Sequence, residues 1–322
     1  MSEHLLPQGY TCLIILGPTA VGKTALAVRL AEYFKGEIIS ADSRQVYCGL
    51  NIGSGKDLDE YTVAYHLIDI TDLSHEYSVY DYQKDFYTAF TDITKRNIIP
   101  IIAGGTGMYL DAIVRAYDLV NVPCNEKMRA ELAGSSMEEL TTYLVRLKKA
   151  TGKTVHNDTD LTERHRLLRA IEIELFNQSS EKTAEKATVK RPDIRPFIIG
   201  TTFPRDMLRA NIKRRLSDRF QSGMIEEVEE LHKIFSWERL ERLGLEYRFI
   251  AQYLQGDIAS RDELEQRLCT AIGQFAKRQE TWYRGMEKKG VHIQWLPHDS
   301  SKKDCHIDTR FAYSLSLLGD NA

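Results

Sequence analysis

The chain has 322 residues, 43% of them hydrophobic and 28% charged, and a formal net charge of −3. This composition is typical of a soluble globular protein with room for a core and a second lobe, and the net charge gives the whole molecule no general affinity for nucleic acid. The apolar runs are too short to cross a bilayer and the five scattered cysteines form no C-x-x-C pair, so we expect a cytoplasmic protein without a disulfide framework or a structural zinc site.

A phosphate-binding loop is predicted near the N-terminus. An apolar run at residues 13–16 leads into Gly17-Pro18-Thr19-Ala20-Val21-Gly22-Lys23-Thr24, and a helical pattern follows. The spacing G-x-x-x-x-G-K-[ST] between a strand and a helix lets backbone amides point at an anion, while Lys23 adds a positive charge and the Thr24 hydroxyl a ligand for Mg²⁺. An ordinary glycine-rich turn is the alternative, and the flanking strand and helix argue against it. The loop is typical of ATP-binding and other nucleotide-binding proteins, and it does not separate kinases from hydrolases or from transferases that release pyrophosphate.

Asp42 follows a second predicted strand, at residues 37–41. Because open α/β folds bind ligands at the carboxyl ends of their strands, Asp42 is expected near the phosphate loop. An arbitrary aspartate at such a point is more often a turn residue or a helix cap. The polar residues that follow, from Ser43 to Tyr47, favour an active-site loop instead.

The next segments extend the predicted sheet. Residues 51–57 form a glycine-rich loop with one lysine, residues 65–70 a short strand, residues 79–95 an amphipathic helix, and residues 98–103 a buried strand in which Pro100 indicates a late start. This strand runs into Gly104 and Gly105, without the aspartate with which nucleotide hydrolases hold Mg²⁺, so a motor-type hydrolase is disfavoured. A lone histidine such as His66 is more often a packing residue, and it is given no role.

Residues 120–195 differ in character. They are more polar, they lack strand patterns, and they contain predicted helices at 137–149 and 162–176 and a predicted mobile loop at 178–192. We therefore predict an α/β fold in which a P-loop NTPase-like parallel sheet flanked by helices, formed by residues 1–120 and 196–322, is interrupted by a helical insertion lobe at 121–195.

The last third of the chain returns to the sheet and then to helices. A strand is predicted at 197–202, and a long helix with a break near Gly223 at 205–235, basic in its first half and acidic in its second. Basic residues on a helix usually form a solvated face, but six within about four turns after a strand make an anion-facing surface at least as good an explanation. Helices at 248–255 and 262–286, a strand at 291–296 and a polar tail are predicted to complete the chain.

Together these stretches resemble the tRNA dimethylallyltransferase family, which prenylates the adenine on the 3′ side of the anticodon. The resemblance spans nearly the whole chain in the family's order. It includes residues 17–24, SADSRQVY at 40–47, IGSGK at 52–56, GGTGMY at 104–109, HND at 156–158 with RLLRA at 166–170, and AKRQ at 276–279 with TW at 281–282. The first stretch is common to many phosphate-binding proteins, whereas the second, about twenty residues after it, is quite specific.

The resemblance implies that dimethylallyl pyrophosphate is the donor, bound by residues 17–24, with Mg²⁺ at Thr24 as the cofactor. It implies that Asp42 accepts a proton from the weakly nucleophilic adenine amine, and that Lys23 and Arg215 stabilise the pyrophosphate leaving group. Thr19 would contact the substrate from within the loop. The adenine must leave its stack and enter a channel with RNA at one end and the donor at the other.

The resemblance also implies a surface for the tRNA anticodon stem-loop, with the insertion lobe gripping the stem. Basic residues on that surface would bind in a salt-dependent way, and a few polar side chains would recognise bases. We expect a monomer with no membrane partner. The implied tRNA contacts are Asp42, Ser43, Arg44, Gln45, Thr106, Arg129, Arg166, Arg169, Arg242 and Tyr247.

The chain departs from the family pattern at several positions. Ile272 and Gly273 stand in place of Thr-Arg, and Glu246 in place of a glycine before Tyr247. Ser54 and Asp57 replace Thr and Pro, and Arg219 replaces a common Met. The lost arginine and the added glutamate are expected to weaken the RNA surface, while the residues for phosphate and for the base pocket are all present.

Other functions remain compatible with the residues alone. A small-molecule or nucleoside kinase would use the same loop for ATP and Asp42 to activate a hydroxyl. A prenyltransferase could act on free adenine nucleotides instead of RNA. A nonenzymatic RNA-binding relative would bind RNA without needing Asp42.

Overall fold

A computed structural model of the chain describes residues 5–152, 163–178, 190–298 and 306–319. The chain divides into two compact units, one formed by Met1–Tyr117 with Arg191–Ala322 and the other by Asp118–Lys190. The HND sequence at 156–158, Cys305 and most of the loop predicted at 178–192 lie outside the described residues.

The larger unit is built on a six-stranded parallel sheet. Its strands are β1 (Cys12–Leu16), β2 (Glu37–Ser40), β3 (Tyr65–His66), β4 (Pro100–Gly104), β5 (Pro196–Gly200) and β6 (Gln294–Trp295). Their order is β3-β2-β4-β1-β5-β6, so β1 pairs with both β4 and β5. Strands of a parallel sheet are covered on both faces, which explains why β1, β4 and β5 are nearly continuous apolar runs.

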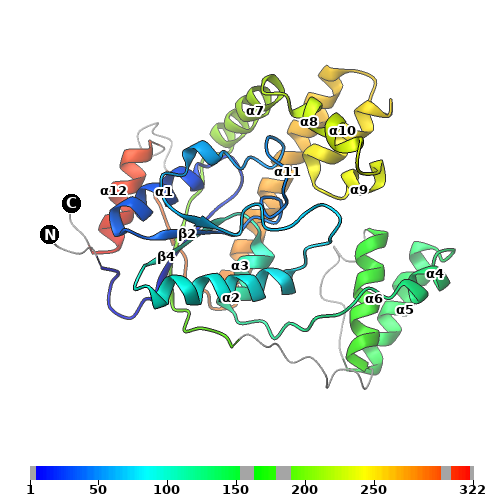
Figure 1. Cartoon of the computed structure of the whole chain (residues 1–322), viewed down its shortest axis with the longest axis horizontal. Coiled ribbons are helices and arrows are strands. Elements are labelled where there is room, and N and C mark those ends of the chain that lie inside the picture. The colour runs from blue at the N-terminus through cyan, green and yellow to red at the C-terminus, as the bar shows by residue number, and fades with distance from the viewer. Residues whose placement is uncertain (1–4, 153–162, 179–189, 299–305, 320–322) are drawn as a thin grey trace. The chain divides into compact units, whose positions relative to one another are not determined.

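Helices flank this sheet. The first two, α1 (Lys23–Phe34) and α2 (Val79–Lys95), lie on opposite sides of it (Figure 1). Further helices of the larger unit are α3 (Gly107–Val114), α7 (Arg205–Gln221), α8 (Met224–His232), α9 (Trp237–Glu241), α10 (Leu245–Leu254), α11 (Arg261–Lys288) and α12 (Ile307–Leu317), with a 3-10 turn η1 (Leu58–Glu60).

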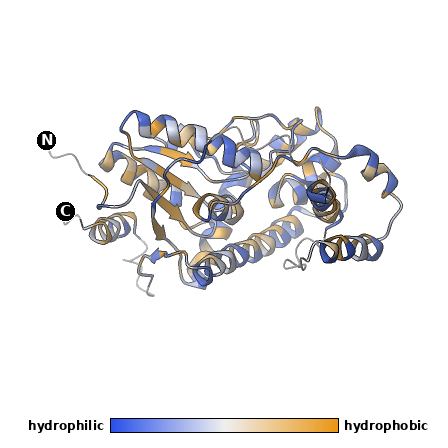
Figure 2. Ribbon diagram, turned by 90° about the horizontal axis from the view of Figure 1, so that it is seen from below, coloured by the Kyte–Doolittle hydropathy of each residue, from blue (hydrophilic) through white to orange (hydrophobic). Residues whose placement is uncertain are grey.

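Two large clusters of described hydrophobic residues help to stabilise the larger unit. One joins a face of the sheet to α1 and α12, with Leu13, Leu26 and Leu315 buried in it. The other joins α7, α8, α10 and α11 and includes Leu216 and Ile272. The strands are almost uniformly hydrophobic, whereas the surface helices carry both kinds of residue (Figure 2). Removal of this apolar surface from water is the main force that stabilises the unit.

The smaller unit is a helical lobe with its own core. It contains α4 (Glu126–Glu131), α5 (Met137–Ala150) and α6 (Arg164–Gln178). Buried residues from all three helices pack together, among them Met128, Leu144 and Ile171. The described residues of this unit contain no strand.

The predicted α/β fold with a parallel sheet and a helical lobe is confirmed. β4 begins at Pro100, which accounts for the late start expected from that proline. The long basic helix is broken at Gly223, whose φ of 94° is readily adopted only by glycine.

Three predictions about the weaker elements were wrong. Where strands were predicted at 65–70 and 291–296, the structure has the two-residue strands β3 and β6. Leu67 and Asp69 adopt positive φ values, which ends β3. The tail predicted to be merely polar contains α12, in which Ile307, Phe311 and Leu315 recur every four residues and pack with the residues of α1.

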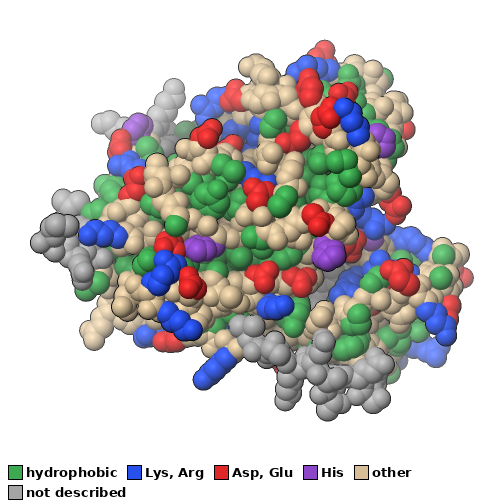
Figure 3. Space-filling view, viewed as in Figure 1, with side chains coloured by type: hydrophobic (Ala, Val, Ile, Leu, Met, Phe, Trp, Pro, Cys, Tyr) green, Lys and Arg blue, Asp and Glu red, His purple; other side chains and the backbone are tan. Residues whose placement is uncertain are grey.

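Charges are mixed on the surface. On the face shown in Figure 3, acidic and basic side chains are interspersed, without one extensive patch of a single sign. Among the residues with described positions, no helix combines the length and the apolar character needed to span a bilayer.

Glu37 forms an ion-pair network at the start of β2. Its carboxylate accepts hydrogen bonds from the Arg96 guanidinium at 2.5 and 2.7 Å and contacts His66 Nε2 at 2.8 Å. The hydrogen bond from Arg96 lowers the pKa of Glu37 from 4.5 to about 2, against the opposing effect of burial. Because the pKa is lower in the folded state, this network stabilises the fold above about pH 4.5, and that stabilisation is lost as the pH falls toward 2.

Glu37→Gln is therefore expected to lower the free energy of unfolding by about 1–3 kcal/mol at pH 7. The difference from the wild type should shrink as the pH falls below 4.5, which urea unfolding at a series of pH values would measure. Asp92→Asn is a matched control, because Asp92 pairs with the same Arg96 at an exposed position and should contribute little. A difference that stays constant with pH would contradict this account of Glu37.

Candidate active site

The loop of residues 17–24 connects β1 to α1 through a tight turn. A Cβ atom on Gly17 would lie 2.1 Å from the carbonyl oxygen of Thr201, so no side chain fits there. Gly22 has a φ of 70° and immediately precedes Lys23, the first residue of α1. A strand, a tight glycine turn and a helix N-terminus are the arrangement with which proteins bind phosphate groups.

Two side chains from α11 fix this loop. Gln279 accepts a hydrogen bond from the Thr19 amide at 2.9 Å and donates one to the Gly105 carbonyl at 2.7 Å. The Tyr283 hydroxyl lies 3.1 Å from the carbonyl oxygens of both Gly17 and Gly105. Helix α11 therefore ties the loop after β1 to the loop after β4. Tyr283 was missed in the sequence, although its position one turn after Gln279 places both on one helix face.

Lys23 is the charged group at the centre of the loop. Its Nζ donates a hydrogen bond to the Pro18 carbonyl at 2.7 Å. Burial lowers the pKa of Lys23 to about 7, and the positive charges of Arg215 and Arg310 act in the same direction. The carboxylate of Asp42 acts in the opposite direction. Groups from three other parts of the chain therefore lie within electrostatic reach of this amine.

Asp42 lies in the loop that follows β2. Its Oδ1 accepts a hydrogen bond from the Arg44 amide at 2.9 Å, which fixes the side chain in a local turn. Its charge acts on Lys23 at the start of α1, on Tyr109 of α3 and on Tyr283 of α11. The carboxylate thus lies at the edge of the sheet where β1, β2 and β4 end, the edge at which open α/β folds bind ligands.

Close packing joins the loops after β2 and β4. The Ser43 amide donates a hydrogen bond to Thr106 Oγ1 at 3.0 Å, and the Thr106 amide donates one to the Ala41 carbonyl at 3.1 Å. A Cβ atom on Gly104 would lie 2.2 Å from that same carbonyl oxygen, so only glycine allows this approach. Ser43 and Thr106 therefore lie together beside Asp42.

Two other residues of this segment lie apart from each other. Gln45 is buried, and it links Ser40 Oγ at 2.8 Å to the Gly55 carbonyl at 3.1 Å, so it connects the end of β2 to the glycine-rich loop. Arg44 extends toward α10, and a Cβ atom on Gly244 would lie 3.2 Å from its Nε.

Helix α7 brings Arg215 and Arg219, one turn apart, onto the glycine-rich loop. A Cβ atom on Gly55 would lie 3.2 Å from Arg215 Nη2 and 1.8 Å from Arg219 Nη2, so both guanidinium groups lie against this glycine. Arg215 also pairs with Asp57, with Nη2 3.6 Å from Oδ2. Burial lowers the pKa of Arg215, and repulsion by Arg219 adds to this effect. A negatively charged ligand would therefore find two closely spaced cations here.

Glu246 was expected to weaken an RNA-facing surface, but its side chain is only 21% exposed and lies 3.8 Å from Arg219. Burial raises the pKa of Glu246, and the charge of Arg219 opposes this effect. Arg219 and Glu246 are both departures from the family pattern. Because the two side chains pair with each other, the added positive charge of Arg219 offsets the added negative charge of Glu246 inside the site.

Glu227 is a site residue that sequence reasoning missed. From α8, its carboxylate accepts hydrogen bonds from the amides of Asn51, Ile52 and Gly53 at 3.1, 2.7 and 3.1 Å. The Tyr247 hydroxyl donates a fourth at 2.9 Å. In the sequence, Glu227 belongs to an acidic run, and no pattern distinguishes it from its solvated neighbours. Its role is to fix the start of the glycine-rich loop.

Glu227→Gln is expected to lower the free energy of unfolding by about 1–3 kcal/mol, because an amide cannot accept from all four donors and leaves at least one of them unpaired. Glu229→Gln, on the exposed side of the same helix, should change it by less than about 0.5 kcal/mol. Urea unfolding of the two variants compares them directly. If both substitutions changed the free energy of unfolding equally, Glu227 would behave like a solvent-exposed residue and would not fix the loop.

Two more of the implied tRNA contacts, Tyr247 and Arg242, differ in exposure. Tyr247 is 1% exposed, and its hydroxyl is used by Glu227. Arg242 lies at the surface and pairs with Glu238 at 2.5 Å and with Glu76 at 3.5 Å. Contact with RNA stays a prediction for both, and Tyr247 would first have to be uncovered.

In the smaller unit, Arg129 and Arg169 are held by one buried carboxylate. Arg129 donates to Glu172 at 2.7 and 3.2 Å, and Arg169 donates to it at 2.9 Å. Burial by itself would raise the pKa of Glu172, but these hydrogen bonds lower it below its ordinary value. Arg166 is more exposed and lies 3.5 Å from Glu163. Arg129 and Arg169 thus stabilise the lobe, whatever they contact beyond it.

The Thr24 hydroxyl lies beside Tyr61, on which several carboxylates act. It forms a hydrogen bond with the Tyr61 side chain. Burial raises the pKa of Tyr61, and the nearby carboxylates of Asp42, Glu60 and Asp57 add to this effect. Mg²⁺ prefers such oxygen ligands and usually binds through one or two protein groups together with substrate phosphates. The described residues contain no cluster of three or more His, Cys, Asp or Glu for a metal held by protein alone.

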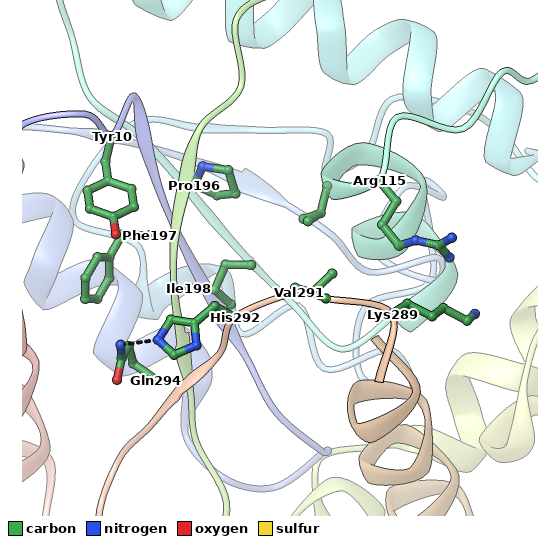
Figure 4. Close-up of a pocket in the computed structure, with 11 residues that line it drawn as sticks. Tyr10, Arg115, Pro196, Phe197, Ile198, Lys289, Val291, His292 and Gln294 are labelled. Carbon is green, nitrogen blue, oxygen red and sulfur yellow. Dashed lines mark hydrogen bonds between the residues drawn. The ribbon is translucent and has the colours of Figure 1, made fainter. Parts of the chain in front are cut away.

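A separate pocket of about 330 Å³ lies at the opposite edge of the sheet (Figure 4). Its lining includes the beginning of β5 at Pro196 and the segment after α11, where His292 contacts Gln294 at 2.6 Å. Because parallel strands begin there and end at the phosphate loop, this pocket is not part of the candidate active site.

Comparison with known proteins identifies relatives over most of the chain. A family model described as IPP transferase matches residues 45–286. The chain is 54% identical to tRNA dimethylallyltransferase 2 of Treponema denticola over 90% of its length and 97% of that protein. It is 47% identical to tRNA dimethylallyltransferase 2 of Citrifermentans bemidjiense over 96% of its length and 95% of that protein.

Solved structures have a similar fold. A full-length tRNA isopentenylpyrophosphate transferase from Bacillus halodurans superposes with a TM-score of 0.64 at 29% identity, covering 96% of this chain and 97% of that one. A eukaryotic dimethylallyltransferase acting on tRNA superposes with a TM-score of 0.72 at 22% identity, covering 97% and 80%, and shows the same fold. From the family model and these closely related sequences, the chain belongs to the IPP transferase family.

Proposed function

We propose that this protein transfers a dimethylallyl group from dimethylallyl pyrophosphate to the N6 amine of the adenine 3′ of the anticodon in tRNA, and releases pyrophosphate. The N6 nitrogen attacks C1 of the donor, the C1–O bond breaks, and pyrophosphate leaves with the electron pair. The N6 proton passes to a carboxylate of the protein.

One observation carries this function. Asp42 from the loop after β2 and Arg215 from α7 both lie within electrostatic reach of Lys23, the first residue of α1. Two cations and one carboxylate are what the reaction needs, because the leaving group gains negative charge while the nucleophile loses a proton. All three belong to a single chain, which is consistent with action as a monomer.

The diphosphate of the donor fits the loop of residues 17–24. The N-terminus of α1 favours an anion through its amides and its dipole. Lys23 and Arg215 would neutralise the charge that develops on the leaving oxygen, and Thr19 would contact the substrate from within the loop. The same residues would bind the diphosphate of the donor before transfer and the released pyrophosphate after it.

The Thr24 hydroxyl would hold Mg²⁺, assisted by the diphosphate oxygens and the nearby carboxylates. The Thr24 hydroxyl and the carboxylates that act on neighbouring Tyr61 supply oxygen atoms, which suit a small hard cation. When bound, Mg²⁺ neutralises charge on the departing pyrophosphate.

Asp42 would act as the general base. An adenine amine is a poor nucleophile, since its lone pair is delocalised into the ring, and removal of its proton during attack helps the reaction. The turn that fixes the Asp42 carboxylate leaves Oδ2 for this proton, because Oδ1 accepts from the Arg44 amide. The base must be extruded from the anticodon loop to reach this carboxylate.

The tRNA would lie along polar and basic residues near this site, with Ser43, Arg44 and Thr106 closest to the extruded base. The helical lobe would grip the anticodon stem, with Arg166 the most exposed of its three implied contacts. Phosphate contacts of this kind give a binding constant that falls steeply with salt.

A direct test incubates the purified protein with Mg²⁺ and dimethylallyl pyrophosphate and measures pyrophosphate release with tRNA, with AMP and with neither. The proposed function predicts release that depends on tRNA. Release that depends on AMP alone would favour a prenyltransferase of free nucleotides. ATP consumption with a soluble hydroxyl acceptor, and no pyrophosphate release from the prenyl donor, would favour a kinase.

A further inference from the structure

Helix α12 returns the C-terminal part of the chain to the first helix. Leu315 is buried in the hydrophobic cluster that α1 forms with the sheet, and Phe311 packs at the edge of that cluster. Asp308 forms an ion pair with Arg29 of α1, and the Arg29 guanidinium lies 4.6 Å from the centre of the Phe311 ring. The helix is thereby docked on α1 by apolar and polar contacts.

From this docked helix, Arg310 extends inward to the phosphate loop. The side chain is only 3% exposed, and its Nη1 donates a hydrogen bond to the Val21 carbonyl at 2.5 Å. The guanidinium also lies 4.9 Å from the centre of the Phe203 ring, which follows β5. A Cβ atom on Gly22 would lie 3.6 Å from the same Nη1. A buried cation is thus held directly against the loop that precedes α1.

This hydrogen bond has a consequence for the geometry of the loop. The peptide between Val21 and Gly22 is planar and trans, so its carbonyl oxygen and its N–H point in opposite directions. When Arg310 holds the Val21 carbonyl, the Gly22 N–H points the opposite way within the peptide plane, away from Arg310. An amide at the N-terminus of a helix that is fixed in this way is prepared to bind an anion.

We infer that Arg310 is a positioning residue for the phosphate loop, through which α12 sets the loop's affinity for pyrophosphate. The inference rests on the proposed function. It extends that function to α12, which lies outside residues 45–286, the part of the chain that the family model matches. The positive charge of Arg310 is among those that act on Lys23, so it also adds to the potential at the anion site.

The test measures binding of inorganic pyrophosphate with Mg²⁺ by calorimetry, and binding of tRNA by filter retention, for the full-length wild type and two variants. Arg310→Met is expected to raise the Kd for pyrophosphate about tenfold, as for loss of one charge-assisted hydrogen bond, and to leave the Kd for tRNA within about twofold. Arg310→Lys keeps the charge and a donor, and is expected to recover at least half of the loss on a logarithmic scale.

Asp308→Asn is the matched control, because it removes the surface ion pair of α12 and leaves Arg310 in place. It is expected to change the Kd for pyrophosphate by less than about twofold. If it weakens binding as much as Arg310→Met, α12 acts only by docking on α1 and the inference is overturned. The inference is also overturned if Arg310→Met binds pyrophosphate like the wild type.

Circular dichroism of each variant checks that it is folded. Should Arg310→Met be unfolded, Arg310→Gln, which keeps an N–H donor without the charge, replaces it under the same criteria. A wild type that does not bind pyrophosphate at all would contradict the proposed function and the inference together. If the wild type binds pyrophosphate and neither Arg310→Met nor Arg310→Lys changes the Kd, the inference alone is contradicted.

Discussion

Asp42→Asn is expected to lower kcat by about 10²- to 10⁴-fold, the usual contribution of a positioned general base. Asparagine has the same shape, and its carbonyl oxygen can still accept from the Arg44 amide, so the local turn should persist. The Kd for tRNA should change by less than about twofold. Single-turnover transfer with the variant and the wild type measures the chemical step directly.

A matched control for this substitution is Asp59→Asn, an exposed position of η1 that should leave turnover unchanged. If Asp42→Asn weakens tRNA binding as much as it slows transfer, Asp42 is a docking residue and another group accepts the proton. If neither quantity changes, the carboxylate has no part in the reaction.

Arg215→Ala is expected to slow transfer by about 10²- to 10³-fold, because it removes a cation from the developing pyrophosphate in a partly buried site. The effect on tRNA binding should be much smaller. Arg214→Ala is the control, since Arg214 is the adjacent residue on the exposed face of α7. Single-turnover transfer rates and filter binding of tRNA separate the two effects.

Equal losses of transfer rate and of tRNA affinity in Arg215→Ala would make Arg215 a docking residue. Loss of transfer in Arg214→Ala of similar size would mean that the basic half of α7 acts through its overall charge. In the structure Arg215 alone of these two lies on the glycine-rich loop, where it pairs with Asp57.

Local sequence patterns were sufficient to predict the elements of the sheet that surround the phosphate loop. Continuous apolar runs identified β1 and β4, and the glycine spacing identified the loop itself, because few backbones other than a phosphate-binding turn need glycines at these intervals. The topology then placed Asp42 at the same edge of the sheet, since parallel strands end together. These inferences depend on short stretches of chain and on general rules of sheet geometry.

The contacts that hold the site together were not predictable in the same way. Glu227 and Tyr283 act across long stretches of sequence, and each looks like an ordinary residue of its own helix. Helix α12 was overlooked because it is short and follows a charged segment. The contact of its Arg310 with Val21 forms only in the folded chain and cannot be seen in the sequence.

The paired departures at Arg219 and Glu246 illustrate the same limit. In the sequence, where nothing links Glu246 to Arg219, the added glutamate suggested a weaker RNA-binding surface. In the fold the two side chains lie 3.8 Å apart and balance each other's charge beside Arg215. A pair of substitutions can thus preserve the electrostatics of a site while changing both residues.

The most direct test of the central claim, that the phosphate loop and Asp42 act on one adenine, is mass spectrometry of an anticodon stem-loop RNA after incubation with the protein, Mg²⁺ and dimethylallyl pyrophosphate. The account predicts an added dimethylallyl group on the adenine 3′ of the anticodon, which nuclease digestion locates, and no product from an RNA with guanine there. An unmodified RNA, or a modification on any other nucleotide, would contradict it.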